Sequence, residues 1–351
     1  MHHLAPSRAR AIRRRCVTRS PVSDPADLFA ATGPGFAKLA EPYRPQDPSS
    51  TLGYAGTKHW HRGSFLSLDT GGKHPVENAT MTTNARFADR LRAWAWWPIY
   101  RIYERRLTRQ VATGPMPQHV GIILDGNRRH GRAAGLHEPE AIYRLGAAKL
   151  DDILTWSADL GIPMVTLWVF SPDNLSRPEA EVDGILGAVE AKIRTLVADP
   201  HIRHRGVRVA AIGRRGILPP ALLDAIDAAQ AATSGNDRMT VTLAIGYGGR
   251  EEITDAVRAL LADSAARGAS IAEILSELSP AAIHRHLYLP ELPDPDLIIR
   301  TSGEVRLSGF LLWQSAHSEL HFCDANWPAF RRIDYLRAIR SFQRRERRYG
   351  R

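Results

Sequence analysis

Six apolar runs recur from Gln118 onward and constrain the fold of this chain more than any other feature. Each run is continuous rather than alternating, as is typical of strands buried on both faces of a sheet. The runs are His119–Leu124, Val165–Phe170, Val207–Ile212, Thr240–Ile245, Leu297–Ile299 and Leu320–Cys323. Most of them are separated by segments of helical length and periodicity. This alternation predicts an α/β fold with a single, mainly parallel six-stranded sheet flanked by helices.

The chain before these runs differs in composition. Residues 1–80 hold 11 Lys and Arg against 6 Asp and Glu, with Pro-, Gly- and Ser-rich stretches and no apolar period. We therefore expect a disordered basic leader over 1–80; alternatively, Met81 is the natural start. Residues 81–115 set Trp, Tyr, Ile and Leu among arginines at near-helical spacing. This pattern predicts an amphipathic lead-in helix that either packs on its own domain or lies at a membrane interface, and the domain itself is expected over 116–351.

Charge and cysteine content narrow the function classes. The 351 residues carry a formal net charge of +10, which points to an anionic partner. Two cysteines, Cys16 and Cys323, exclude a disulfide framework and a four-thiolate zinc site, and fit a reducing cytoplasm. The longest apolar stretch, residues 93–100, contains a proline and is far shorter than the roughly 20 residues that span a bilayer. An integral membrane protein is therefore excluded at this stage.

Polar side chains gather where the predicted strands end. Ligands of open α/β sheets bind beyond the carboxyl ends of the strands. The segments there are Asp125–Arg129, Ser171–Asn174, Gly213–Arg215, Gly246–Arg250 and Arg300–Gly303. Most join small residues to arginine, a combination that suits phosphate oxygens. Asp125 is the exception, because a carboxylate among anion ligands is out of place unless a metal ion or a proton requires it. The hard cation that we expect is Mg²⁺, held by a carboxylate together with substrate phosphates. The usual nucleotide-binding glycine motifs are missing from the sequence.

These blocks resemble, in order, the signature segments of the cis-prenyltransferases, the isoprenyl transferase family that includes undecaprenyl diphosphate synthase. The matching text includes HVGIILDGNRRHGRAAG, TLWVFSPDNLSRPEAEVDGIL, GYGGREEI and RTSGEVRLSGFLLWQSAHSELHF. The resemblance runs from about residue 116 to 350 and is most similar to the actinobacterial short-chain Z-farnesyl diphosphate synthase-like members. It implies a transferase with an undecaprenyl diphosphate synthase-like fold. Such an enzyme condenses isopentenyl diphosphate with an allylic diphosphate, geranyl or farnesyl, into a short- or medium-chain Z-polyprenyl diphosphate.

The resemblance also implies roles for individual residues. Asp125 and Asn174 are expected to be catalytic, and Asp125 and Glu319 are expected to hold Mg²⁺, Glu319 through a dimer interface. The expected substrate-binding residues are Gly126, Asn127, Arg128, Arg129, His130, Phe170, Ser171, Leu175, Arg177, Arg300, Arg306, Leu307 and Ser308.

Several positions depart from the family pattern. His130 and Leu175 stand where tryptophan is common, and Tyr143 stands near a position where many members carry histidine. We expect these departures to change substrate choice rather than abolish activity. Val169, at a position associated with tunnel width, favours short or medium products through its intermediate size.

Three alternatives compete with the interpretation as an active short- or medium-chain cis-prenyltransferase. They are a long-chain (decaprenyl or undecaprenyl) synthase, a non-catalytic partner subunit, and a nucleic-acid-binding protein. No nucleic acid is expected, because the sequence contains no recognised nucleic-acid-binding module. The expected assembly is a homodimer, and the expected location is cytoplasmic, or peripheral at the inner face of the cell membrane.

Overall fold

The computed structural model describes residues 98–345, apart from the side chains of His201 and Arg203. The leader expected over residues 1–80, and the first part of the lead-in segment, lie outside the described residues. The lead-in segment enters the described part of the chain as a helix over residues 98–112.

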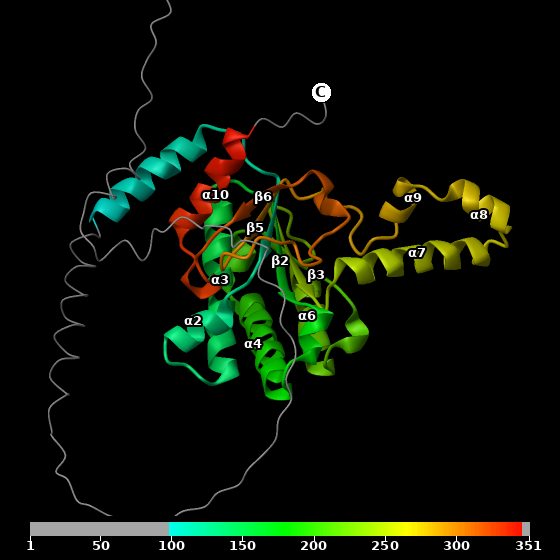
Figure 1. Cartoon of the computed structure of the whole chain (residues 1–351), viewed down its shortest axis with the longest axis horizontal. Coiled ribbons are helices and arrows are strands. Elements are labelled where there is room, and N and C mark those ends of the chain that lie inside the picture. The colour runs from blue at the N-terminus through cyan, green and yellow to red at the C-terminus, as the bar shows by residue number, and fades with distance from the viewer. Residues whose placement is uncertain (1–97, 346–351) are drawn as a thin grey trace, which may run out of the picture. The chain divides into compact units, whose positions relative to one another are not determined.

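A six-stranded sheet forms the centre of the domain (Figure 1). The strands are β1 (His119–Ile123), β2 (Met164–Phe170), β3 (Val207–Ile212), β4 (Met239–Ile245), β5 (Leu297–Arg300) and β6 (Glu319–Phe322). Their order is β3-β4-β2-β1-β5-β6, and every pairing is parallel. Each strand overlaps its predicted run, so the predicted α/β class is confirmed, with a described sheet that is parallel throughout rather than mainly parallel.

Helices cover both faces of this sheet. The longer ones are α3 (Pro139–Asp159), α4 (Glu179–Ala198), α6 (Pro220–Thr233), α7 (Gly249–Ala266) and α10 (Arg332–Arg344). The shorter ones are α2 (Asn127–Ala133), α5 (Pro200–His204), α8 (Ile271–Glu277) and α9 (Pro280–His284). Among the helices that the structure describes, none combines the length and the apolar character needed to cross a bilayer.

Alternate residues of the central strands point into two separate apolar cores. Val120 and Ile122 of β1 point into the larger core, which α3, α4, α6 and α10 complete. Ile123 of β1 belongs to the smaller core, in which Phe310 and Tyr247 are fully buried. Because both faces of the strands are covered, the continuous apolar runs of the sequence have a direct structural cause.

The helix over residues 98–112 lies beside α10 (Figure 1). Leu107 and Val111 are buried in the larger core, and the Gln343 side-chain amide donates to the Val111 carbonyl at 2.8 Å. The Arg331 guanidinium lies over the ring of Tyr100. One face of the lead-in helix therefore packs on its own domain.

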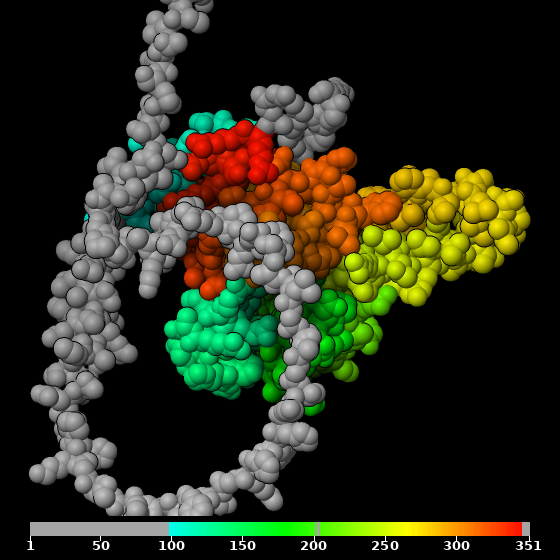
Figure 2. Space-filling view, viewed as in Figure 1, coloured from blue at the N-terminus to red at the C-terminus, as the bar shows by residue number. Residues whose placement is uncertain are grey.

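At another edge of the domain, α7, α8 and α9 form an arm that extends away from the sheet (Figures 1 and 2). The short helix α8 exposes Ile271 and Leu275, at 77% and 66% of their surface.

Candidate active site

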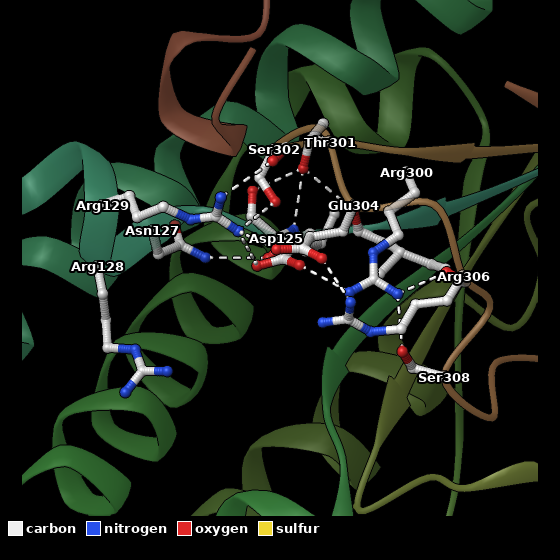
Figure 3. A network of polar contacts seen from close by, with 12 residues as sticks. Asp125, Asn127, Arg128, Arg129, Arg300, Thr301, Ser302, Glu304, Arg306 and Ser308 are labelled. Carbon is white, nitrogen blue, oxygen red and sulfur yellow. Dashed lines mark hydrogen bonds and ion pairs between the residues drawn. The ribbon is translucent and has the colours of Figure 1, made fainter. Parts of the chain in front are cut away.

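The site is built around Asp125, the second residue after β1. Parallel pairing sets Ile123 of β1 opposite Arg300 of β5, so the segment after β1 meets the end of β5. Arg300, only 4% exposed, donates from Nη2 to Asp125 Oδ2 at 2.8 Å (Figure 3). Its Nη1 donates to Ser308 Oγ at 2.7 Å. A buried guanidinium thus fixes the carboxylate and the loop after β5 together.

The electrostatics of this pair keep Asp125 ionised. Burial alone would raise the pKa of Asp125, but the hydrogen bond and positive charge of Arg300 outweigh it and hold the pKa below its usual range. Asp125 is therefore a carboxylate at neutral pH. This carboxylate could bind a divalent cation together with the phosphate oxygens of a ligand.

Gly126 allows the chain to turn into α2. Its φ of 98° lies in the left-handed region, and a Cβ there would come within 2.4 Å of Asn326 Oδ1. Only glycine meets both conditions without strain. Helix α2 then begins at Asn127, whose side-chain amide donates to the Leu124 carbonyl at 3.1 Å.

Glu304 links Arg129 of α2 to Arg306 of the loop after β5 (Figure 3). Arg129 of α2 donates from Nη2 to Glu304 Oε1 at 3.2 Å and to Ser302 Oγ at 2.9 Å. The other carboxylate oxygen of Glu304 accepts from Arg306. Ser302 and Ser308 both have a positive φ, 76° and 51°, so the loop between them is held in a conformation that these residues rarely adopt.

The segment after β2 supplies the opposite wall. The Asn174 side-chain oxygen accepts from the Ser171 backbone N–H at 3.0 Å and fixes the turn. Arg177 donates from Nη1 to Tyr143 Oη at 3.0 Å and to Glu181 Oε1 at 2.9 Å. Burial and the hydrogen bond to Glu181 raise the pKa of Tyr143 to about 12, so its phenol stays a donor.

A cavity of about 560 Å³ collects most of the predicted site residues at the carboxyl end of the sheet. Those that line it are Asp125, Gly126, Asn127, Arg128, Arg129, Phe170, Ser171, Asn174, Arg177, Arg300, Arg306 and Ser308. The cavity also receives side chains that we did not predict as ligands, among them Arg132, Asp173 and Glu304. Arg132 follows Arg128 by four positions on α2, so helical periodicity was the signal that could have identified it.

Four predicted residues do not line this cavity. His130 is half-buried in α2, Leu175 is 44% exposed, and Leu307 packs against the smaller core. Glu319 begins β6 opposite Leu297, whereas Asp125 follows the other end of β1. Because the strands are parallel, Glu319 lies at the opposite edge of the sheet, where its carboxylate contacts Arg345. One copy of the chain therefore does not bring Glu319 to Asp125.

The two arginines after β3 form ion pairs with aspartates and do not line the cavity. Arg214 donates to both carboxylate oxygens of Asp255 at 2.9 Å, and Arg215 donates to Asp227 at 2.7 Å. The strand ends that build the site are therefore those of β1, β2 and β5.

A second, apolar cavity of about 70 Å³ adjoins the polar one. It lies between the sheet and helices α3 and α4, and Tyr143, Val169 and Ile185 line both cavities. An arginine-rich chamber joined to an apolar one suits a molecule with an anionic head and a hydrocarbon tail.

Comparison with known proteins gives this geometry a context. A family profile described as putative undecaprenyl diphosphate synthase matches residues 123–350. The chain is 51% identical over 254 residues to the isoprenyl transferase of Thermus thermophilus, covering 72% of this chain and 96% of the relative. It is 48% identical over 253 residues to the (2Z,6E)-farnesyl diphosphate synthase of Thermobifida fusca, covering 72% of this chain and 97% of that enzyme.

Solved structures show the same likeness. Lavandulyl diphosphate synthase from Lavandula x intermedia, in complex with dimethylallyl diphosphate, is 32% identical with a TM-score of 0.61, covering 67% of this chain and 99% of the other. A probable undecaprenyl diphosphate synthase from Campylobacter jejuni is 26% identical with a TM-score of 0.55, covering 68% of this chain and 100% of the other.

Proposed function

The chain belongs to the undecaprenyl diphosphate synthase family, the cis-prenyltransferases, and we propose that it condenses isopentenyl diphosphate with geranyl or farnesyl diphosphate. In this reaction the allylic C–O bond breaks and pyrophosphate leaves. A carbon–carbon bond forms to isopentenyl diphosphate, which then loses a proton. The product is a short- or medium-chain Z-polyprenyl diphosphate.

The observation that carries the proposal is the division of the polar cavity between two arginine groups. Arg128 and Arg129 come from α2, and Arg300 and Arg306 come from the end of β5 and its loop. Two groups suit two diphosphates, because an exposed arginine such as Arg128 or Arg306 can hold phosphate oxygens through paired N–H donors. Preplaced positive charge also stabilises the pyrophosphate as it departs.

Asn174 is our proposed participant in removal of the proton. Its side chain lines the cavity beside Ser171, and the hydrogen bond from the Ser171 N–H to its oxygen fixes the amide at the cavity wall. We assign the allylic diphosphate to the α2 arginines and isopentenyl diphosphate to Arg300, Arg306 and Ser308, as the family resemblance implies.

Mg²⁺ fits the donors that the site offers. Among the described residues, no group of three or more His, Cys, Asp or Glu side chains could hold a metal ion by itself. Mg²⁺ commonly binds through one or two carboxylates and completes its coordination with substrate phosphates and water. Asp125 is the carboxylate that we propose for this role, and the bound ion would neutralise charge on the leaving diphosphate.

A homodimer is the assembly that we propose. The exposed apolar side chains of α8, such as Ile271 and Leu275, give the chain a surface for a second copy. Glu319 contributes to Mg²⁺ binding in our proposal only through such a dimer, because it lies away from Asp125 in its own copy. Sedimentation velocity of the full chain measures the assembly state.

We propose a cytoplasmic location with peripheral binding at the inner face of the membrane. The helix over residues 98–112 exposes Ile99 and Ile102, at 49% and 65%, next to the exposed Arg105, Arg106 and Arg109. Apolar and cationic side chains on one helix favour an anionic bilayer surface. Co-sedimentation with vesicles of anionic or neutral lipid tests this, and equal binding to both would contradict it.

The activity is tested with the purified full chain, Mg²⁺ and isopentenyl diphosphate, in parallel reactions with geranyl, farnesyl and geranylgeranyl diphosphate. Chromatography of the products against chain-length standards gives the primer preference and the final length. We expect short or medium products, because Val169, which lines both cavities, has a side chain of intermediate size. Decaprenyl or undecaprenyl products would favour the long-chain alternative. No product with any primer would favour a non-catalytic partner subunit.

A further inference from the structure

Two consecutive residues near the end of β2 face opposite sides of the sheet, and both line the site. Side chains along a strand point to alternate faces. Val169 packs against the larger core and lines both cavities. Trp168 packs against the smaller core and lines only the polar cavity. The end of β2 therefore presents a different apolar side chain to each side of the site.

Trp168 lies at the same level of the sheet as the buried arginine of the site. Strand pairing sets Ile123 of β1 opposite Trp168 of β2 on one side and opposite Arg300 of β5 on the other. Residues paired in this way in parallel strands point to the same face of the sheet. Ile123 belongs to the smaller core and lines the polar cavity. Ile123 and Trp168 therefore form an apolar surface on the face from which Arg300 projects.

The indole ring of Trp168 is fixed by two contacts. It stacks on the ring of Phe310, with 5.5 Å between the ring centroids and 15° between the planes. Its Nε1–H donates to the Tyr247 carbonyl at 2.9 Å. Phe310 and Tyr247 are fully buried, so both contacts hold the indole against well-packed neighbours. The ring itself is half-buried, and its uncovered part faces the polar cavity.

We propose that Trp168 is a specificity-determining residue that binds the five-carbon tail of isopentenyl diphosphate. This inference rests on the proposed function, in which Arg300, Arg306 and Ser308 bind the diphosphate of the same molecule. Guanidinium and hydroxyl groups are partners for phosphate oxygens, not for a hydrocarbon. An indole surface, in contrast, is stabilised when an apolar group covers it. Trp168 thus distinguishes isopentenyl diphosphate from free pyrophosphate, which presents the same oxygens to the arginines.

The same arrangement keeps the two hydrocarbon groups of the reaction apart. The apolar cavity between α3 and α4 lies on the Val169 side of β2, whereas Trp168 lies on the other side. An isopentenyl tail that covers Trp168 therefore leaves the apolar cavity to the allylic chain. Both substrates can then be bound at once, as a condensation requires.

The test measures the contribution of the tail in a complex that does not turn over. The full chain is first saturated with Mg²⁺ and geranyl thiolodiphosphate, an unreactive primer analogue. Calorimetry then gives the affinities of isopentenyl diphosphate and of methyl diphosphate, which has the same charged head without the tail. In the unaltered chain we expect isopentenyl diphosphate to bind more tightly by about tenfold or more. Trp168→Ala should lower this affinity ratio by about tenfold, because it removes the apolar contact of about two carbons of the tail.

Tyr288→Ala is the matched control for damage to the smaller core. Tyr288 also packs against that core and contacts the Tyr247 ring, but it does not line the polar cavity. Its affinity ratio should equal that of the unaltered chain. Trp168→Phe keeps an aromatic ring beside Phe310 and should keep most of the ratio. Thermal unfolding of each variant verifies the fold.

The emission of Trp168 gives a second readout that does not need the alanine variant. It is obtained as the difference between the spectra of the unaltered chain and of Trp168→Phe. Isopentenyl diphosphate should change this difference spectrum, because its tail displaces water from the indole, and methyl diphosphate should not. An equal response to both diphosphates would overturn the proposal.

The calorimetric outcomes separate this inference from the proposed function. An affinity ratio in Trp168→Ala equal to that of the unaltered chain would overturn the role of Trp168 even if the enzyme is active. An equal loss in Tyr288→Ala would also overturn it, since the effect would then come from the smaller core as a whole. Failure of the unaltered chain to bind either diphosphate would count against the proposed function itself, and the role of Trp168 would fall with it.

Discussion

Asp125 and Arg300, which are 175 positions apart in the chain, share a hydrogen bond of 2.8 Å between Oδ2 and Nη2. The pairing of β1 with β5 makes this contact possible, because it sets the ends of both strands at one edge of the sheet. The arginine is almost fully buried, while 30% of the aspartate side chain is exposed. The buried arginine orients the carboxylate. The exposed part of the carboxylate faces the cavity, where a ligand can contact it.

Replacement of Asp125 should impair the chemistry far more than the fold. Asp125→Asn keeps an oxygen that can accept from Arg300, but the buried guanidinium loses its counter-charge, so we expect the melting temperature to fall while the chain still folds. Its turnover should fall about 100-fold or more, because a preplaced charge is lost from the reacting centre. Initial rates at saturating substrates and thermal melts measure the two effects. Turnover within a few-fold of the unaltered enzyme would remove Asp125 from the catalytic residues.

Arg306→Ala should mainly weaken the binding of isopentenyl diphosphate. A charge-assisted hydrogen bond is worth about 1.5–3 kcal/mol, so the KM for this substrate should rise by about 10- to 100-fold. The KM for the allylic primer should change much less. Arg215→Ala is the control, because Arg215 is similarly exposed but pairs with Asp227 outside the cavity. An unchanged KM in Arg306→Ala would assign the isopentenyl diphosphate clamp to other residues.

Glu304 should couple the two substrate sites. Its carboxylate holds Arg129 on one oxygen and Arg306 on the other. Glu304→Ala frees both side chains at once, so we expect the KM values of both substrates to rise together, by about tenfold for a loss of about 1.4 kcal/mol at each site. Steady-state kinetics with each substrate varied in turn measures this. A rise for one substrate alone would show that Glu304 serves a single site.

Gly146→Ala should disturb the junction of the two cavities. A Cβ at Gly146 would come within 2.2 Å of Asn127 Oδ1, and the neighbouring Trp327 donates to the Gly146 carbonyl at 2.8 Å. Overpacking of this kind typically costs about 1–3 kcal/mol of unfolding free energy. We expect lower stability in urea and a loss of turnover through displacement of Asn127.

Gly187→Ala is the matched control for that change. Gly187 lies in the interior of α4, is exposed, and has open space where a Cβ would stand. The same substitution there should stabilise the chain by about 0.5–1 kcal/mol, because alanine is the better helix former. Equal effects of the two substitutions would contradict a special role for the Gly146 contact.

His119 should make stability depend on pH. Its Nδ1 lies 2.7 Å from the Pro293 carbonyl and its Nε2 lies 2.8 Å from Thr166 Oγ1. The carbonyl can only accept, so the neutral ring donates from Nδ1 and accepts from Thr166. Burial lowers the pKa of His119, so the folded chain binds this proton less readily than the unfolded chain.

The sign of the His119 effect follows from that difference. Its contribution is fully present above the unfolded pKa of about 6.5 and is lost as pH falls toward the lower folded pKa. The slope from this one group is at most about 1.4 kcal/mol per pH unit. Urea unfolding between pH 5 and 8 measures it. His119→Gln, which does not titrate, should flatten the slope over that window, and an unaltered slope would assign the effect to other groups.

The strands were predictable because burial on both faces leaves a continuous apolar run, as in β2 and β4. The meeting of Asp125 with Arg300 was predictable too, since parallel strands bring their ends to one edge of a sheet. The contacts of Tyr143 with Arg177 and Glu181 were not. They join α3 to α4 and to the residues just before α4, and the angle at which the two helices pack depends on side chains across the whole contact.

Leu175 and Leu307 show the limit of assignment by motif. Each lies inside a segment that builds the site, yet Leu175 faces solvent and Leu307 faces the smaller core. A motif fixes which segment is near the ligand, whereas the backbone of that segment decides which side chains point toward it. The positive φ values of Ser302 and Ser308 are such backbone details, and residue type gives no signal for them.

The central place of β1 has a consequence for biosynthesis. β1 pairs with β2, which follows it closely, and with β5, which is made only much later. At about 5–20 residues per second, a ribosome needs about 9–35 s to pass from Asp125 to Arg300. During that interval the nascent chain carries one edge of β1 unpaired and a carboxylate without its arginine. Until β5 emerges, β1 is therefore open to mispairing, and a chaperone that shields that edge would raise the yield of folded enzyme.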